Sequence, residues 1–292
     1  MKINRLTSFI IIAAVYALAT VLGVWVYFAI SGAVWLRLLI ADCVATVVTF
    51  VFSLIFRNAS VYDPYWSVQP IIIVFAFLFA GGVTLPKILI CVIIGLWGVR
   101  LTANWAYTFH GLAYQDWRYT SLKEKTGAFY PFVNFFGIHL VPTLIVYACT
   151  LPAIYVMQSL ESFNPLCLIG LVISLFAVVL QATADIQMHK YRKNRTGNFI
   201  RTGVWKYSRH PNYLAEICMW WGIALFTVFQ VGFEWYYLIG ALLNTLLFLF
   251  VSIPLADGRQ SKKEGFAEYK QQTRMLLPIK KHNGLGKKME RQ

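Results

Sequence analysis

Charged residues are scarce in this chain, and acidic residues are the scarcest of them. Only 13% of its 292 residues are charged and 12 are Asp or Glu, whereas a soluble domain has about 25% charged residues. Hydrophobic residues make up 59% of the chain. A soluble core of this length cannot hide so much apolar surface, so the composition excludes an ordinary soluble domain. It predicts a protein that crosses a membrane several times.

The sequence patterns of disulfide frameworks, metal sites and common nucleotide sites are also missing. The five cysteines lie in apolar segments without C-x-x-C spacing, which is typical of small packing residues. The five histidines form neither an H-x-x-x-H nor an H-E-x-x-H pattern, so we predict no metal site. Without G-x-G-x-x-G or a Walker loop, we expect neither a Rossmann site nor a P-loop.

The sequence contains several long apolar runs. A membrane span needs about 20 apolar residues, and we expect an all-α, polytopic membrane helical bundle of about eight transmembrane helices. A short amphipathic segment, Asp257–Thr273, is predicted to form a C-terminal helix at the membrane interface. The expected spans are Ser8–Ile30, Ala33–Phe56, Ser67–Leu85, Pro86–Phe109, Phe132–Met157, Pro165–His189, Asn212–Phe229 and Trp235–Leu255.

No long polar stretch separates these spans. We therefore predict one transmembrane domain over residues 1–281, followed by a basic, flexible tail at 282–292. No cleavable signal is expected at the N-terminus, because the first apolar run is long enough for a membrane helix and no small-residue cleavage motif follows it.

The net charge of +14 is concentrated in a few loops. Seven Lys or Arg lie from Lys190 to Arg209 and ten from Arg259 to the end, and with eight spans these clusters share one side with both termini. The opposite loops hold only Arg37 and Lys87, which predicts cytoplasmic termini. The basic tail indicates attraction to anionic membrane lipids. The apolar segments between the clusters exclude a nucleic-acid-binding protein, and no obligate protein partner is evident.

One polar stretch, Gly203–Glu216, stands directly before an apolar run. Pro211 is predicted to be the first residue of a helix, because it has no N–H to leave unpaired there. Arg209, His210 and the free backbone N–H groups of that helix would then point toward one place. This arrangement predicts an anion site at the membrane surface.

The residue types around this stretch favour a nucleotide that carries phosphates. Arginine can bind phosphate through two parallel hydrogen bonds, aromatic rings can stack on a planar base, and carboxylates can accept hydrogen bonds from ribose hydroxyls. The candidates that supply these groups are Asp185, Arg192, Arg201, Trp205, Lys206, Tyr207, Ser208, Arg209, His210, Asn212, Tyr213 and Glu216.

Ionisable groups inside a span are costly and are often functional. Helical spacing places Arg100 near Trp97 and Asn104 on one face, where it lines an inner site or extends to the interface. Asp185 and His189 also share a face, either as part of a ligand site or as a local ion pair at a helix end.

Three further acidic or basic groups in apolar surroundings receive no function, namely Asp42, His139 and Glu234. Asp63 has two interpretations. It is either a helix-capping residue at the start of the third span or part of a site that faces the cytoplasm.

Several blocks together resemble the steroid 5-alpha-reductase C-terminal family, in particular its bacterial multi-pass branch. They are Asp63-Pro-Tyr-Trp-Ser67, Trp97-Gly-Val-Arg-Leu101, Asp116-Trp-Arg-Tyr119, Asp185, Gly203-Val-Trp-Lys-Tyr-Ser-Arg-His-Pro-Asn-Tyr-Leu-Ala-Glu216 with Trp220-Trp221-Gly222, and Phe266-Ala-Glu-Tyr269. The resemblance covers a core of residues 63–278. The wider superfamily includes sterol C14-reductases and isoprenylcysteine carboxyl methyltransferases.

The resemblance implies a bacterial inner-membrane reductase that uses NADPH to reduce a conjugated carbonyl (enone) double bond in a lipophilic, steroid-like or polyprenoid substrate from the bilayer. It implies catalytic roles for Asp63, Trp97 and Arg100, and substrate contacts for Tyr65, Trp66, Asn104 and Tyr107. The implied cofactor contacts are Asp185, His189, Arg192, Tyr207, Ser208, Arg209, His210, Asn212, Tyr213, Glu216 and Arg259.

The chain departs from the family pattern at two places. The steroid reductases carry a Gln-Glu pair where this chain has Asp63, and a tyrosine where it has Trp97. Two other functions therefore stay open. One is an S-adenosylmethionine-dependent methyltransferase acting on a lipid or a prenyl-cysteine, and the other is a non-catalytic lipid-binding membrane protein.

Overall fold

The computed structural model describes residues 4–79, 82–194 and 197–278. These residues form helices and turns without a β-strand, which confirms the predicted all-α membrane fold. Their contacts divide the chain into two compact units. The first unit is Met1–Cys167 with Thr227–Gly240, and the second unit is Leu168–Phe226 with Ala241–Gln292. One domain over residues 1–281 stays a prediction, and the predicted tail at 282–292 lies outside the described residues.

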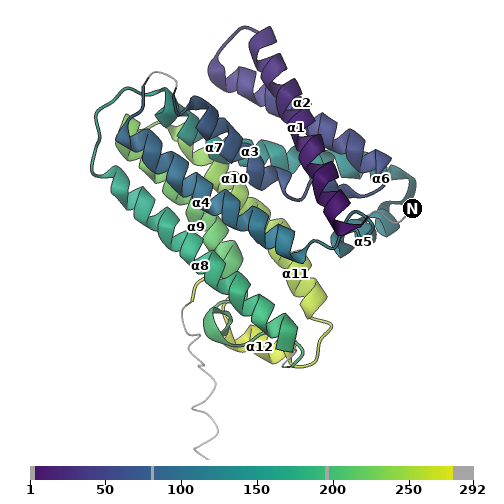
Figure 1. The fold of residues 1–292 in the computed structure, drawn as a ribbon. Coiled ribbons are helices and arrows are strands. Elements are labelled where there is room, and N and C mark those ends of the chain that lie inside the picture. The colour runs from purple at the N-terminus through teal and green to yellow at the C-terminus, as the bar shows by residue number, and fades with distance from the viewer. Residues whose placement is uncertain (1–3, 80–81, 195–196, 279–292) are drawn as a thin grey trace, which may run out of the picture. The chain divides into compact units, whose positions relative to one another are not determined.

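The helices follow one another in the order shown in Figure 1. The elements up to residue 158 are α1 (Arg5–Ala29), α2 (Val34–Ile55), η1 (Ala59–Val61), α3 (Tyr65–Phe77), α4 (Leu85–Thr108), α5 (Trp117–Thr126), η2 (Gly127–Phe129), α6 (Tyr130–Val133), η3 (Asn134–Leu140) and α7 (Val141–Gln158). The later elements are α8 (Cys167–Asn194), η4 (Gly203–Lys206), α9 (Pro211–Val231), η5 (Trp235–Leu238), α10 (Ile239–Leu247), η6 (Phe248–Ser252), α11 (Ile253–Gln260) and α12 (Phe266–Gln272).

Seven helical stretches of the described chain are long and apolar enough to cross a membrane, one fewer than the expected eight. The missing span is Ser67–Leu85, because α3 contains only 13 residues and ends at Phe77. A helix of that length is about 20 Å long, shorter than a hydrocarbon core of about 30 Å. The residues between α3 and α4 include Gly82, whose φ of 92° is a conformation that glycine adopts without strain.

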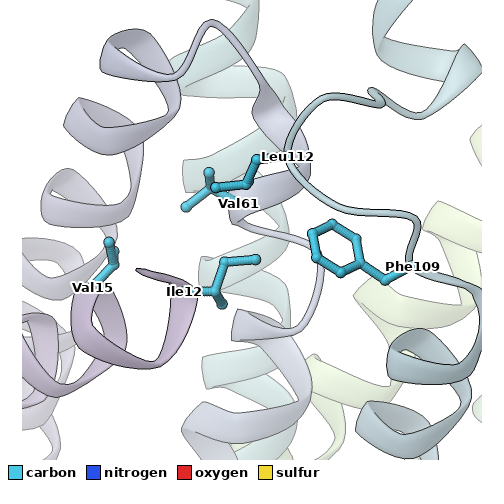
Figure 2. Close-up of a cluster of buried hydrophobic side chains, with 5 residues drawn as sticks. All are labelled: Ile12, Val15, Val61, Phe109 and Leu112. Atoms are coloured by element: carbon cyan, nitrogen blue, oxygen red, sulfur yellow. The ribbon is translucent and has the colours of Figure 1, made fainter. Parts of the chain in front are cut away.

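The first unit is held together by apolar side chains from segments far apart in the sequence. Figure 2 shows Ile12 and Val15 of α1 beside Val61 of η1 and beside Phe109 and Leu112, which follow α4. All five side chains are buried. Burying a side chain of this size contributes about 1.5–3 kcal/mol, so this cluster fixes the loops after α2 and α4 to the start of α1.

The second unit depends on close approach between α8 and α9. A Cβ added to Gly170 of α8 would lie 2.3 Å from the backbone nitrogen of Phe226 in α9, and one added to Gly222 would lie 2.7 Å from the carbonyl oxygen of Gly170. Ser174 donates a hydrogen bond to the carbonyl of Met219 across the same contact, at 3.1 Å. Small residues allow such approach between helices in a membrane.

The C-terminal amphipathic helix predicted over Asp257–Thr273 is present only in part. Its first residues belong to the end of α11, and α12 covers Phe266–Gln272 with its apolar side packed on protein. Phe266 and Tyr269 are buried and contact Phe199, with ring centroids 5.3 and 5.1 Å from the Phe199 ring. α12 starts after Gly265, which has a φ of 76°. The periodicity predicted the helical part around Phe266 and Tyr269 but not the break before it, and the surface that covers α12 includes Phe199, in the loop before η4.

Candidate functional site

The polar stretch before α9 confirms its sequence prediction at the start of the helix, whereas Arg209, His210 and their backbone N–H groups contact protein groups. α9 begins at Pro211, which confirms the predicted first residue of this helix. The backbone N–H groups of Arg209 and His210 donate to the carbonyls of Arg274 and Met275, at 3.0 and 3.2 Å. The segment after α12 thereby satisfies the donors that precede the helix, as buried backbone groups require.

Asp257 of α11 holds the charged side chains of this stretch. Its carboxylate accepts from Arg209 Nη2 at 3.2 Å and from His210 Nε2 at 2.9 Å, and Lys270 Nζ lies 3.7 Å away. Arg209 Nη1 also donates to the carbonyl of Thr273 at 2.5 Å. Asp257, Arg209 and His210 are all buried. The cation and the imidazole are thus directed into the second unit, where a single carboxylate orients both.

Glu216 also makes its contacts inside the second unit. Its two oxygens accept from Gln181 Nε2 of α8 at 2.7 Å and from Trp220 Nε1 at 2.9 Å. The side chain is 3% exposed. A buried carboxyl in a membrane span needs such donors, and here they come from the neighbouring helix and from the next turn of α9.

The predicted cofactor contacts separate by exposure, and all of them lie in the second unit. The buried ones are Ser208, Arg209, His210 and Glu216; the partly buried ones are Asp185, His189, Asn212 and Tyr213; the exposed ones are Arg192, Tyr207 and Arg259. Tyr213 stacks on His210, with ring centroids 5.2 Å apart and ring planes at 3°. Their contact with a cofactor stays a prediction.

The second unit also contains exposed cationic residues, which lie before and after Arg209 and His210 in the sequence. Besides Arg192 and Arg259, the exposed residues include Arg201, Lys206 and Arg274. The guanidinium of Arg201 lies over the Phe199 ring, 4.4 Å from its centroid. Arg209 itself retains one buried donor, Nε, without a hydrogen-bond partner among the described residues. This donor set suits an anion with several oxygens.

In the first unit, Asp63 and Tyr119 form a close pair. The Tyr119 hydroxyl donates to Asp63 Oδ1 at 2.5 Å, and both side chains are partly buried. Burial raises the pKa of Asp63 to about 6, although the positive charge of Arg118 and the Tyr119 hydrogen bond oppose the rise. The capping interpretation of Asp63 is wrong, because Pro64 is the N-cap of α3 and no side chain caps that helix.

The other predicted catalytic residues lie on α4. Trp97 is fully buried and meets the ring of Trp66 edge-on, with centroids 6.2 Å apart. Arg100 is partly buried one turn further along α4. Ser67, which follows Trp66, shares a 2.8 Å hydrogen bond with Thr102, two residues after Arg100. This bond joins α3 to α4.

The predicted substrate contacts have different surroundings. Trp66 and Asn104 are partly buried, whereas the Tyr107 side chain is 70% exposed. Tyr65 is buried and donates to Asp42 Oδ1 at 2.6 Å. Tyr65 is therefore packed within the first unit, and Tyr107 is the most exposed of the four.

A family model described as protein of unknown function (DUF1295) matches residues 49–273, most of the chain. The chain belongs to this family. The DUF1295 family is linked to steroid 5-alpha-reductase-like proteins, which confirms the resemblance at that coarser level.

One curated relative of the DUF1295 chain is an uncharacterized protein of Schizosaccharomyces pombe, 27% identical over 199 residues. The alignment covers 58% of this chain and 58% of that protein, so the chain spans less than two thirds of the relative's length. No solved structure matches the chain.

Sequence reasoning missed two residues of these clusters, Asp257 and Tyr119. Both fall within the DUF1295 match. Asp257 is an isolated carboxylate before a basic segment, and its partners lie 47 and 48 residues away. Tyr119 ends a block that carried the family resemblance, 56 residues from Asp63. Contacts over such separations leave no local sequence pattern. The position of Asp257 beside a basic segment is nevertheless a signal that could have indicated an ion pair.

Replacing Asp257 by asparagine tests whether it anchors the cluster. Because the change leaves the buried Arg209 without its carboxylate, we expect a loss of about 3–5 kcal/mol in the free energy of unfolding. SDS-induced unfolding of the purified protein measures this loss. Lys270→Gln is the matched control, because Lys270 is 57% exposed, and exposed pairs contribute about 0–1 kcal/mol. Equal small effects of both changes would contradict the anchoring role.

The raised pKa of Asp63 predicts a pH dependence of stability. Its carboxyl titrates near 3.8 in the unfolded chain and at about 6 in the folded one. The folded state therefore holds the extra proton between these values, so the contribution of Asp63 to stability is greatest below about pH 4 and falls as pH rises through 6. Unfolding of wild type and Asp63→Asn across this range checks the sign. The variant should lose the downward slope, and an unchanged slope would refute the assignment.

Proposed function

We propose that this protein is an integral-membrane, NADPH-dependent reductase of a conjugated carbonyl double bond in a lipophilic, steroid-like or polyprenoid lipid. The Asp63–Tyr119 pair is the observation that supports this best. Reducing such a double bond adds a proton for every two electrons, so the enzyme needs a proton-holding group. A carboxyl with a pKa of about 6, 2.5 Å from a tyrosine hydroxyl, is half protonated at about pH 6, where an unperturbed aspartate is ionised.

The tyrosine and the carboxyl have complementary roles in this proposal. The Tyr119 hydroxyl can donate toward a carbonyl oxygen, and Asp63 can replace the proton that Tyr119 gives up. Burial of Asp63 keeps its proton available in the pH range where an unperturbed aspartate is ionised. The residue pair could therefore fill the role left open by Trp97, which stands where the steroid reductases carry a tyrosine.

The donor set of the second unit fits a nucleotide with phosphates. The exposed cations Arg192, Lys206 and Arg259 would contact the phosphates, and the 44% exposed Tyr207 ring would stack on the planar base. The buried residues, including Arg209, His210 and Glu216, would shape and hold the loop that carries these contacts. When bound, NADPH supplies the two electrons of the reduction as a hydride.

The proposal also includes the family branch, the membrane and the orientation of the chain. We place the chain in the bacterial multi-pass branch of the steroid-reductase-like proteins and in a bacterial inner membrane, with both termini in the cytoplasm. That orientation requires an even number of crossings, so it keeps the predicted span that starts at Ser67 as an eighth crossing beside the seven long apolar helices. The lipophilic substrate would enter from the bilayer, and its proposed contacts are Tyr65, Trp66, Asn104 and Tyr107.

NADPH oxidation by the purified protein, with a panel of enone lipids, tests the proposal. We expect oxidation that depends on lipid, and a loss of about 10²–10⁴-fold in Asp63→Asn and in Tyr119→Phe, because each change removes the proton donor. NADPH should still raise the unfolding temperature of both variants, since the cofactor contacts are assigned elsewhere.

Glu234→Gln is the control, because Glu234 is an exposed carboxylate of the first unit; its rate should match wild type. Folded protein that is stabilised by S-adenosylmethionine and unaffected by NADPH would replace the reductase with a methyltransferase. Protein that binds neither would favour the non-catalytic lipid-binding function.

A further inference from the structure

α2 carries a stripe of buried polar side chains through the membrane-spanning part of the first unit. Asp42, Thr46, Thr49 and Ser53 follow one another at helical spacing, and none is more than 5% exposed. The stripe extends about 16 Å along the helix, roughly half of the hydrocarbon core of a membrane. Polar groups at this depth are costly and mark functional paths in many membrane proteins.

Hydroxyl groups connect the stripe to α3 and α7 in one chain. Tyr62, between η1 and α3, shares a 2.8 Å hydrogen bond with Thr143, and Thr143 shares one of 2.9 Å with Thr46. Thr46 lies one helical turn after Asp42 on α2, where its side chain interacts with the Tyr65 hydroxyl. Tyr65 donates to Asp42 Oδ1 at 2.6 Å. Four hydroxyls therefore lie in series, each able to donate one proton and accept another, and the series ends on a carboxyl group.

The carboxyl at the end has only neutral groups around it. Gln69 donates to Asp42 Oδ2 at 2.9 Å, the second donor beside Tyr65. The titratable groups that interact with Asp42 are Cys43, Tyr62, Tyr65 and Tyr147. None of them is a cation, and no ion pair of Asp42 exists among the described residues. Asp42 therefore differs from Asp257, which has positive partners.

Each end of the series also has a buried polar atom without a hydrogen-bond partner among the described residues. At one end it is Nε2 of His139, whose ring centroid lies 4.8 Å from that of Tyr62. At the other it is Oε1 of Gln69, the amide that holds Asp42. Both side chains are at least nine-tenths buried. Buried polar atoms left unpaired need an explanation, and their position at the two ends suits points where a proton enters and leaves.

The backbone around His139 is unusual as well. Asn134–Leu140 forms a π-helical turn, and His139 Nδ1 lies 3.0 Å from the carbonyl oxygen of Asn134 within it. π-helical turns occur frequently at functional sites. The hydrogen bond at Nδ1 fixes the ring and leaves Nε2 as the nitrogen that can exchange a proton.

We propose that this series is a proton relay, which leads from His139 through Tyr62, Thr143, Thr46 and Tyr65 to a proton-binding site at Asp42 in the membrane interior. In one transfer Tyr65 gives its proton to the Asp42 carboxylate and takes one from Thr46, which takes one from Thr143. Thr143 takes its proton from Tyr62, and Tyr62 is reprotonated by water at the His139 end. One proton moves inward and no bond other than O–H changes.

Infrared spectroscopy of the reconstituted protein during transfer to D₂O tests the relay without cofactor or substrate, so it does not depend on the proposed reductase activity. Protonated Asp42 should give a carboxylic C=O band that Asp42→Asn lacks. If that variant does not fold, ¹³C-aspartate in the wild-type chain identifies the aspartate band instead. Breaking the series with Thr46→Val should slow deuterium exchange of this band by about tenfold, equivalent to about 1.4 kcal/mol on the barrier.

Thr49→Val is the matched control. Thr49 lies on the same stripe and is fully buried, but its hydroxyl donates only to the backbone carbonyl of Thr46. Its exchange rate should stay at the wild-type value. The relay is overturned if the Thr46→Val and wild-type bands exchange equally fast, or if no aspartate band reports a protonated carboxyl at neutral pH.

Discussion

A polar group in the interior of a membrane must find its partner within the protein, because lipid offers none. Three carboxylates in the described spans show this constraint. Glu216 takes donors from its own helix and from α8. Asp257 collects Arg209 and His210. Asp42 has only a tyrosine and a glutamine. The scarcity of charge in the sequence therefore has a structural counterpart, since each of these three carboxylates has a defined set of partners.

In the second unit, the same constraint divides the polar motif into two kinds of residue. Arg209 and His210 point inward to Asp257, so their strongest interactions hold the start of α9 against the segment after α12. Tyr207 and Lys206, next to them in the sequence, are exposed. Arg209 and His210 thus fix the backbone, while Lys206 and Tyr207 stay accessible. A preorganised ligand site requires such an arrangement.

Local sequence patterns predicted the parts of the fold that depend on neighbouring residues. The start of α9 at Pro211 and the helical segment after α11 follow from backbone chemistry and periodicity. The end of α3 at Phe77 was not predictable from hydropathy, because apolar residues continue past it. The partners of Asp63 and Arg209 were missed, since Tyr119 and Asp257 lie 56 and 48 residues away. Asp42 had no assigned role because its partners Tyr65 and Gln69 lie on α3, 23 and 27 residues away.

The account depends most on the assignment of a nucleotide with phosphates to the second unit. Isothermal titration of the purified protein with NADPH and, separately, with S-adenosylmethionine measures this directly. The account predicts saturable NADPH binding that weakens as salt rises and is weaker in Lys206→Ala, with no binding of S-adenosylmethionine. Binding of S-adenosylmethionine in the absence of NADPH binding, or NADPH binding that is indifferent to salt and to Lys206, would contradict it.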